Sequence, residues 1–191
     1  MTIEAAHVTT ALDSSSLVSR AQAGDEDAFT MLVERHRHSV YRTAWAILRN
    51  DADALDAAQE TFISAWKQLG RLRDPSRFEA WLTRSLVNRC RTVLRSRRRT
   101  SVREIAIADS AGPEGSSESG VVDGSFEDTD SIRRAFERLS ADHRTYLVLH
   151  YVEGRPISEI VLIVGAPAGT VKWRLSEARR ALERNLAREN R

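Results

Sequence analysis

The chain of 191 residues lacks most of the features that redox, disulfide or membrane chemistry needs. Its single cysteine, Cys90, excludes a disulfide within the chain and any cysteine-based zinc site. No apolar run approaches the roughly 18 residues of a membrane-spanning helix. Residues 1–16 lack the basic start and the apolar stretch of a secretory signal. These absences predict a cytoplasmic chain without membrane insertion.

The sequence is equally poor in catalytic and metal-binding patterns. It has no phosphate-binding glycine loop, no dinucleotide fingerprint and no paired nucleophile and base. The acidic residues between Asp51 and Glu60 are not accompanied by a glycine-spaced calcium loop. His36 and His38 are two positions apart, so on a helix they point to different sides. We therefore expect no enzyme, no metal site and no cofactor.

The near-neutral charge of the chain, a formal +2, conceals a strong segregation of charge along its length. Residues 17–99 carry a net +6 and residues 131–191 a net +5, whereas residues 100–130 carry a net −7. Four of the nine glycines lie in the acidic segment, among serines and carboxylates, which is a composition too poor in apolar residues to fold. This pattern predicts a flexible tail at 1–16 and two basic domains joined by a flexible acidic linker at 100–130.

The first basic block has the apolar periodicity of three helices, which we place at 27–49, 53–69 and 77–98. Gly24 and Asp25 form a plausible turn and cap before the first helix, and Gly70 is placed as the C-terminal glycine of the second.

The third of these helices carries an unusual basic face. Between residues 67 and 99 there are 11 basic and 2 acidic residues. Polar positions follow one another at steps of four, three, four and three: Arg84, Asn88, Arg91, Arg95 and Arg98. Arginine pairs well with phosphate, and Trp66, Phe78 and Trp81 could stack on bases. The pattern favours nucleic-acid binding over the alternative, a helix face that is merely exposed to water.

The second basic block predicts four short helices: 131–139, 140–152, one opening at Pro156, and one opening at Pro167 after a turn at Gly165. A short helix, a glycine turn and a basic helix are typical of a helix-turn-helix, although an ordinary helical hairpin is the alternative. The predicted fold class is therefore all-α, with two small helical domains, a helical bundle and a helix-turn-helix, joined by the linker.

Three stretches together resemble a bacterial sigma factor of the extracytoplasmic-function group within the sigma-70 family. The segment QETF (59–62) lies on the second helix, the basic helix follows it, and GAPAGTVKWRL (165–175) follows a helical hairpin some 110 residues downstream. The resemblance covers about residues 17–99 and 131–187. It implies a chain that binds core RNA polymerase, recognises and melts promoter DNA to start transcription, and is controlled by an anti-sigma protein.

The resemblance also implies a role for individual residues. The expected polymerase-binding residues are Asp56, Gln59, Glu60 and Phe62. The residues expected to capture the minus-ten promoter element are Arg71, Arg73, Arg77, Arg84, Asn88, Arg91 and Arg95. Those expected to read the minus-thirty-five element are Ala168, Thr170, Lys172, Trp173, Arg174, Ser176 and Glu177.

Some positions depart from the family pattern. Trp173 stands where a small serine is frequent and Glu177 where arginine is frequent, so the usual minus-thirty-five sequence is in doubt. Val161 replaces a common alanine in the first helix of the motif.

Two other function classes remain open on the residues alone. A helix-turn-helix regulator that binds operator DNA without polymerase would be a dimer on a palindromic site. An interaction protein could instead sequester a regulator through its acidic helix.

Overall fold

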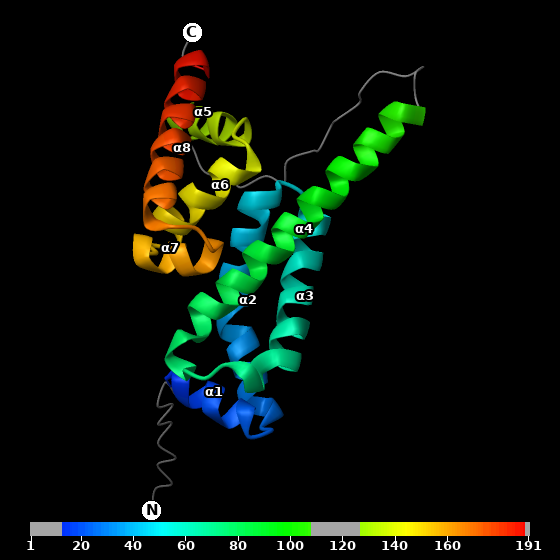
Figure 1. The fold of residues 1–191 in the computed structure, drawn as a ribbon, viewed down its shortest axis with the longest axis vertical. Helices are drawn as coiled ribbons and strands as arrows, with labels where there is room; N and C mark the ends of the chain where they lie inside the picture. Colours follow the sequence, from blue (N-terminus) through cyan, green and yellow to red (C-terminus); the bar gives the residue numbers. More distant parts are fainter. Residues whose placement is uncertain (1–12, 108–126, 190–191) are drawn as a thin grey trace, which may run out of the picture.

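A computed structural model describes residues 13–107 and 127–189, and every element in these ranges is helical (Figure 1). This confirms the predicted all-α class. The first helical unit contains α1 (Ser14–Gln22), α2 (Glu26–Leu48), α3 (Asp51–Gln68), the 3-10 turns η1 (Leu69–Arg71) and η2 (Pro75–Arg77), and α4 (Phe78–Ile107). The second helical unit contains α5 (Glu127–Glu137), α6 (Ala141–Leu147), the π-helical turn η3 (Val148–Val152), α7 (Ile157–Val164) and α8 (Ala168–Glu189). No helix in the described ranges is long and apolar enough to cross a membrane.

Local capping explains where the helices of the first unit begin. The Asp25 carboxylate accepts a hydrogen bond from the Ala28 N–H at 2.9 Å and so starts α2. The Asn50 side chain accepts one from the Asp53 N–H at 2.9 Å and starts α3. Each side chain satisfies a backbone donor that has no partner in the first helical turn. Both helices lie within two residues of their predicted bounds.

Three expectations about the first unit are wrong in detail. Residues 14–16 belong to α1 rather than to a tail, because Leu17 and Val18 of that helix are fully buried. Gly70 lies inside η1 and does not have a positive φ. The left-handed residue that ends a helix here is Arg49, with φ 54°, after α2.

The expected linker is also shorter than 100–130 at both ends. Helix α4 continues past the predicted end at residue 98 to Ile107, and α5 begins at Glu127. Residues 1–12 of the expected tail and residues 108–126 of the expected linker lie outside the described residues.

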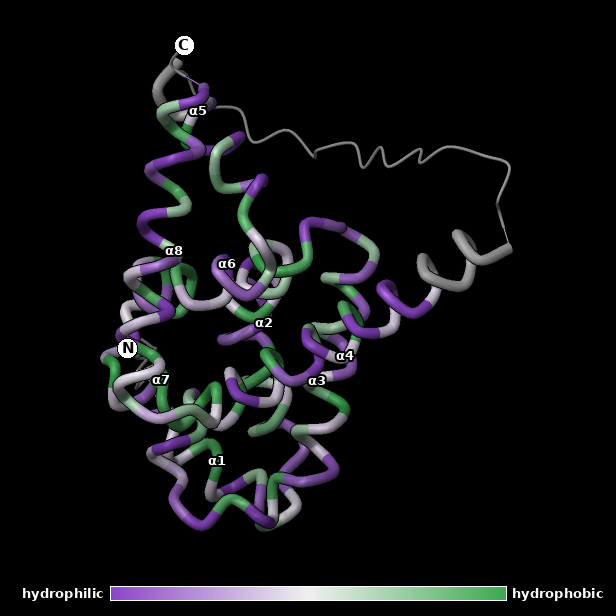
Figure 2. The backbone as a smooth tube through the Cα atoms, turned by 45° about the horizontal axis from the view of Figure 1, so that its top comes forward, coloured by the Kyte–Doolittle hydropathy of each residue, from purple (hydrophilic) through white to green (hydrophobic). Residues whose placement is uncertain are grey.

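The second unit follows the predicted turn chemistry closely. The Ser140 hydroxyl accepts a hydrogen bond from the His143 N–H at 3.2 Å and caps α6. Gly154 (φ 63°) ends η3, and Gly165 (φ 69°) ends α7 in a left-handed conformation that a larger residue would adopt only with strain. Hydrophobic and hydrophilic stretches alternate along the helices, as amphipathic packing requires (Figure 2).

The two units pack against one another. Helix α6 contacts α2, and α7 contacts α4. Buried residues of both units join in one apolar cluster, to which the second unit contributes Tyr146, Leu149, Ile160 and Ile163 among others. A smaller cluster around Leu139, Leu147 and Ala178 belongs to the second unit alone. The sequence left this relative placement open.

Candidate nucleic-acid and protein interfaces

The basic face of α4 is present in the structure. Successive residues of an α-helix are turned by about 100°, so the spacing of Arg84, Asn88, Arg91 and Arg95 places them within about 60° of one another. Arg84, Asn88 and Arg95 are exposed, whereas Leu82 and Leu86 on the other side of the helix are buried. The buried side fixes the helix on the bundle and leaves the polar face free to meet a ligand.

Arg91 differs from its neighbours on this face. It is half-buried, and its Nη1 donates a hydrogen bond to the Val164 carbonyl at 3.2 Å. Val164 is the last residue of α7, so the basic face of α4 already has one contact with the second unit.

The loop before α4 presents three more of the expected basic residues, Arg71, Arg73 and Arg77, and all three are exposed. The Asp74 carboxylate accepts hydrogen bonds from the Ser76 hydroxyl (2.6 Å) and the Ser76 N–H (3.1 Å), which hold the pKa of Asp74 below its usual range. Arg77 also pairs with Asp74, at 3.2 Å. The turn at η2 is thereby fixed, with Arg71 and Arg73 beside it.

The aromatic residues near this face do not act as one group. Phe78 is 1% exposed and belongs to the core, so the expectation that it offers a face to a base is wrong. Trp81 is half-buried beside it, with ring centroids 6.0 Å apart. Trp66 is 41% exposed but lies on α3, packed on Phe29 of α2 at a centroid distance of 4.8 Å. Only Trp81 remains a stacking candidate on α4 itself.

Helix α3 presents the acidic face. Asp56, Gln59 and Glu60, three of the expected polymerase-binding residues, are exposed. Two nearby carboxylates are already used within the unit, since Asp53 pairs with Arg97 and Asp51 accepts a hydrogen bond from the Tyr41 hydroxyl. Asp56 and Glu60 have no ion-pair partner in the part of the chain that the structure describes, and so remain available to a basic partner.

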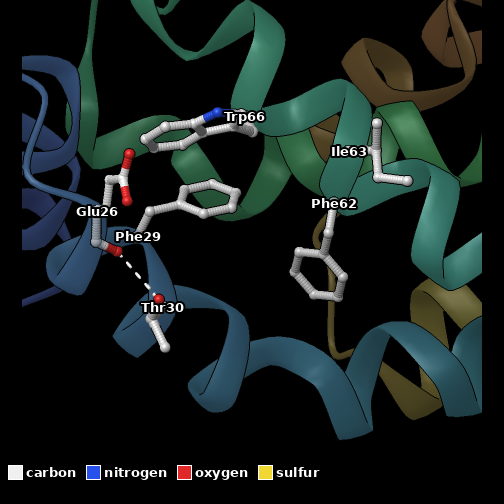
Figure 3. A pocket seen from close by; sticks show the side chains of 6 residues that line it. All are labelled: Glu26, Phe29, Thr30, Phe62, Ile63 and Trp66. Carbon is white, nitrogen blue, oxygen red and sulfur yellow. Dashed lines mark hydrogen bonds between the residues drawn. The ribbon is translucent and has the colours of Figure 1, made fainter.

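The fourth expected residue on this helix, Phe62, lines a surface groove of about 410 Å³ between α2 and α3 (Figure 3). Phe29, Phe62, Ile63 and Trp66 provide its apolar lining, and the Glu26 carboxylate lies at its edge (Figure 3). An apolar groove with an acidic edge suits a helix that combines apolar and basic side chains.

The helix-turn-helix consists of α7, the turn at Gly165 and α8. Val171, Leu175 and Ala178 are buried and attach α8 to the unit, as the four-three spacing predicts. The first turn and a half of α8 is open to solvent, because Ala168, Thr170, Lys172 and Trp173 are exposed. This is the end of a recognition helix that meets base edges in the motif.

The remaining residues on α8 are held by neighbours. The Arg174 guanidinium lies 5.0 Å from the centre of the Trp173 ring and forms an ion pair with Asp142 of α6 at 3.1 Å. Ser176 and Glu177 are half-buried, and Glu177 pairs with Arg180 at 3.2 Å. Asp142 was not predicted as part of this surface, since nothing in the local sequence connects it with a residue 32 positions later.

The described residues offer no obvious catalytic or metal chemistry. Burial raises the pKa of the Cys90 thiol to about 12, so it stays protonated and unreactive near neutral pH. Burial lowers the pKa of His36, which packs on Phe78 at a centroid distance of 5.6 Å. Within the described ranges no three His, Cys, Asp or Glu side chains are placed to hold a metal ion.

Comparison with known families matches both units in order. Residues 32–100 match the model of sigma-70 region 2, and residues 129–182 match the model of sigma-70 region 4. The RNA polymerase sigma-H factor of Pseudomonas aeruginosa is 32% identical over 179 residues, which cover 89% of this chain and 92% of that protein. The ECF RNA polymerase sigma-E factor of Salmonella typhimurium is 31% identical over 189 residues, covering 89% and 92%.

Two solved structures are similar to the whole arrangement. One is the structure of CnrH in complex with the cytosolic domain of CnrY, with a TM-score of 0.64 and 26% identity, covering 91% of this chain and 97% of that chain. The other is the sigma factor RpoE in complex with the anti-sigma factor NepR from Bartonella quintana, with a TM-score of 0.65 and 26% identity, covering 83% and 96%.

Proposed function

The chain belongs to the sigma-70 family of bacterial RNA polymerase sigma factors, in its extracytoplasmic-function group, and from this premise we propose which of its surfaces bind polymerase and which bind promoter DNA. As a sigma factor it binds core RNA polymerase and directs promoter recognition, melting and initiation, without being an enzyme itself. Neither a stand-alone operator-binding regulator nor a sequestering protein accounts for both matched regions.

The acidic face of α3 and the groove beside it are the polymerase-binding surface in this proposal. The supporting observation is that Asp56 and Glu60 are exposed and unpaired within the described residues, next to the apolar groove that Phe62 lines. Unpaired carboxylates around an apolar groove complement a basic amphipathic helix and steer it electrostatically.

The basic face of α4 and the N-terminal end of α8 are the promoter-binding surfaces. Melting costs about 1.4 kcal/mol per base-pair step on average, and stacking returns about 1–3 kcal/mol per base. A few captured bases therefore offset a few melted steps, which fits the short basic face of α4 and the half-buried Trp81. Exposed Lys172 and Trp173 support a role for α8 in reading the minus-thirty-five element.

Two further parts of the proposal rest on the relatives. RpoE of Bartonella quintana was solved with an anti-sigma factor, and we propose that this chain is likewise held inactive by an anti-sigma protein. We also propose that it acts in the cytoplasm, where RNA polymerase works, because its relatives are named as RNA polymerase sigma factors.

Run-off transcription tests the central claim. Purified core polymerase with a randomised promoter library is expected to give, only when the chain is added, transcripts whose templates share two short elements at a fixed spacing. The absence of any product above core polymerase alone would contradict the function.

A pair of variants separates the polymerase surface from the rest. Asp56→Asn with Glu60→Gln removes two charges from α3 and should weaken binding to core polymerase by roughly tenfold, mostly through slower association. Glu34→Gln, which removes an exposed charge from α2, is the control and should leave binding unchanged. If both variants bind core polymerase with equal affinity, Asp56 and Glu60 do not belong to the polymerase-binding surface.

A further inference from the structure

The loop that joins α3 to α4, residues 69–77, consists of two short 3-10 turns and a connecting stretch. Each turn has only three residues, and Leu72 after the first turn is extended. The carbonyl groups of such a loop have no continuous helix to bond them, yet a carbonyl that is shielded from water needs a donor. The position of this loop therefore depends on donors from other parts of the chain.

Gln22, the last residue of α1, supplies two such bonds. Its Nε2 donates to the Leu69 carbonyl at 2.9 Å and to the Leu72 carbonyl at 2.7 Å, which uses both N–H bonds of the amide. The Gln22 side chain is half-buried, and α1 lies against both turns of the loop (Figure 1). Because a carbonyl only accepts, an ionised glutamate of the same shape could not replace this glutamine.

The two bonds fix the part of the loop that carries the expected basic residues. Leu72 packs on the apolar cluster of the fold. Side chains next to an extended residue point to the side opposite its own, so Arg71 and Arg73 point outward, and both are exposed. The Leu69 carbonyl lies before this pair of arginines and the Leu72 carbonyl lies between them, so the Gln22 amide determines how the pair is presented.

Helix α1 provides a rigid support for this amide. Its residues Leu17 and Val18 are fully buried. The turn from α1 to α2 is closed by Arg20, whose guanidinium binds the Asp25 carboxylate at 2.6 and 2.8 Å. The same carboxylate caps α2, so one side chain holds both the end of α1 and the beginning of α2. Because its backbone is held on both sides, Gln22 keeps the loop in one position.

We propose that Gln22 is a positioning residue for minus-ten recognition: its two hydrogen bonds hold the loop in the conformation that presents Arg71 and Arg73 to the promoter strand. Gln22 precedes residues 32–100, which match sigma-70 region 2, and it is none of the residues expected to bind DNA or polymerase. An effect of Gln22 on promoter choice therefore acts through the loop. The inference rests on the proposed function, in that this loop is taken to capture the minus-ten element.

Amide hydrogen exchange of the free chain tests whether Gln22 holds the loop. Gln22→Met keeps a side chain of similar length and removes both donors. The Leu72 N–H, which donates to the Leu69 carbonyl at 3.0 Å, should then exchange roughly tenfold faster, since two hydrogen bonds that hold the turn are lost. The Ala28 N–H, which Asp25 caps, should keep its exchange rate. An unchanged exchange rate at Leu72 would overturn the proposal.

Promoter selection by the polymerase complex tests what the loop does. With Gln22→Met and a run-off library randomised at both elements, the preference among minus-ten sequences should fall by roughly tenfold, which is the order of discrimination by one good base contact. The minus-thirty-five preference and the affinity for core polymerase should stay the same, because the amide holds neither α8 nor the acidic face of α3. A chain that is merely less stable would lose all three together, and that result, like an unchanged minus-ten preference, contradicts a positioning role.

Two further variants complete the experiment. Gln22→Lys keeps N–H donors at the end of the side chain and should restore the minus-ten preference. Its added charge attracts all sequences about equally, so it leaves the ratio between sequences unchanged. A preference as weak as that of Gln22→Met would mean that the donors do not position the loop.

Gln68→Met is the matched control, because Gln68 is exposed on α3 and its Nε2 donates to the Ser64 hydroxyl of its own helix at 2.8 Å. Its exchange rates and promoter preferences should equal those of the unaltered chain, and equal effects of Gln22→Met and Gln68→Met would overturn the proposal. If the unaltered chain directs no transcription, the proposed function fails, and the exchange rates alone then decide whether Gln22 holds the loop.

Discussion

The two basic helices α4 and α8 show the same periodic pattern of apolar and basic residues in the sequence, but they have different neighbours in the fold. Each has a buried apolar stripe and a polar face rich in arginine. On α4, Arg91 of that face donates a hydrogen bond to a backbone carbonyl of the other unit. Among the described residues, the first turn of α8 has no such contact with the first unit, and the nearby Arg174 forms an ion pair with Asp142 of its own unit. Periodicity thus identifies a face, and tertiary packing decides how much of it is available.

The largest effect should come from removing the free charges of α4. Arg84→Ala with Arg95→Ala deletes two exposed guanidiniums, and charged hydrogen bonds are worth about 1.5–3 kcal/mol each, so promoter complexes should weaken by at least about a hundredfold. The salt dependence should also fall, by about 0.7 in log–log slope for each lost contact to a single strand. The measurement is promoter binding by the polymerase complex as a function of salt.

Arg37→Ala is the matched control for that pair. Arg37 is exposed on α2, and among the residues that the structure describes its ion pair is with Glu34 of its own helix, at 2.9 Å, so neither affinity nor salt slope should change. A salt slope that stays the same in the α4 variant would mean that these arginines do not meet phosphate.

Within α8, two adjacent exposed residues should behave differently. Lys172→Ala should weaken binding to all promoters about equally, because a phosphate contact carries no sequence information. Trp173→Ala should instead change which minus-thirty-five sequences are selected, since a base contact discriminates by about 1–3 kcal/mol. Selection from a library randomised at that element measures both the overall affinity and the sequence preference of each variant. If both variants rank the sequences in the same order, Trp173 does not contact the bases of the minus-thirty-five element.

How much of this could be read from the sequence depends on whether an interaction is local. Asp25, Ser140 and Gly165 act within four residues of their own position, and the sequence predicted all three. Helix α1 was missed because only three of its nine residues, Leu17, Val18 and Ala21, are buried, which is too short a stripe to show a period.

The contacts between the units could not be predicted in the same way. Arg144 and Arg91 donate to the backbone carbonyls of Ile47 and Val164, and a carbonyl is present at every position whatever the side chain. The basic face of α4 was found from its helical spacing and the polymerase-binding residues through a family motif, and the roles of all the site residues remain predictions. What the fold adds is which of them are exposed, paired or buried.

The smallest expected effect concerns Arg174, the arginine of α8 that is held by an ion pair while the exposed arginines of α4 are not. Asp142→Asn removes the ion-pair partner of Arg174 while keeping a side chain of similar shape, so Arg174 would be free to meet DNA as the exposed arginines of α4 are. Exposed pairs are worth about 0.2–1 kcal/mol, so minus-thirty-five binding should tighten by at most about fivefold. Glu183→Gln, an exposed charge further along α8, controls for the general loss of negative charge. If Asp142→Asn weakens binding instead, the pair positions Arg174 for the DNA rather than competing with it.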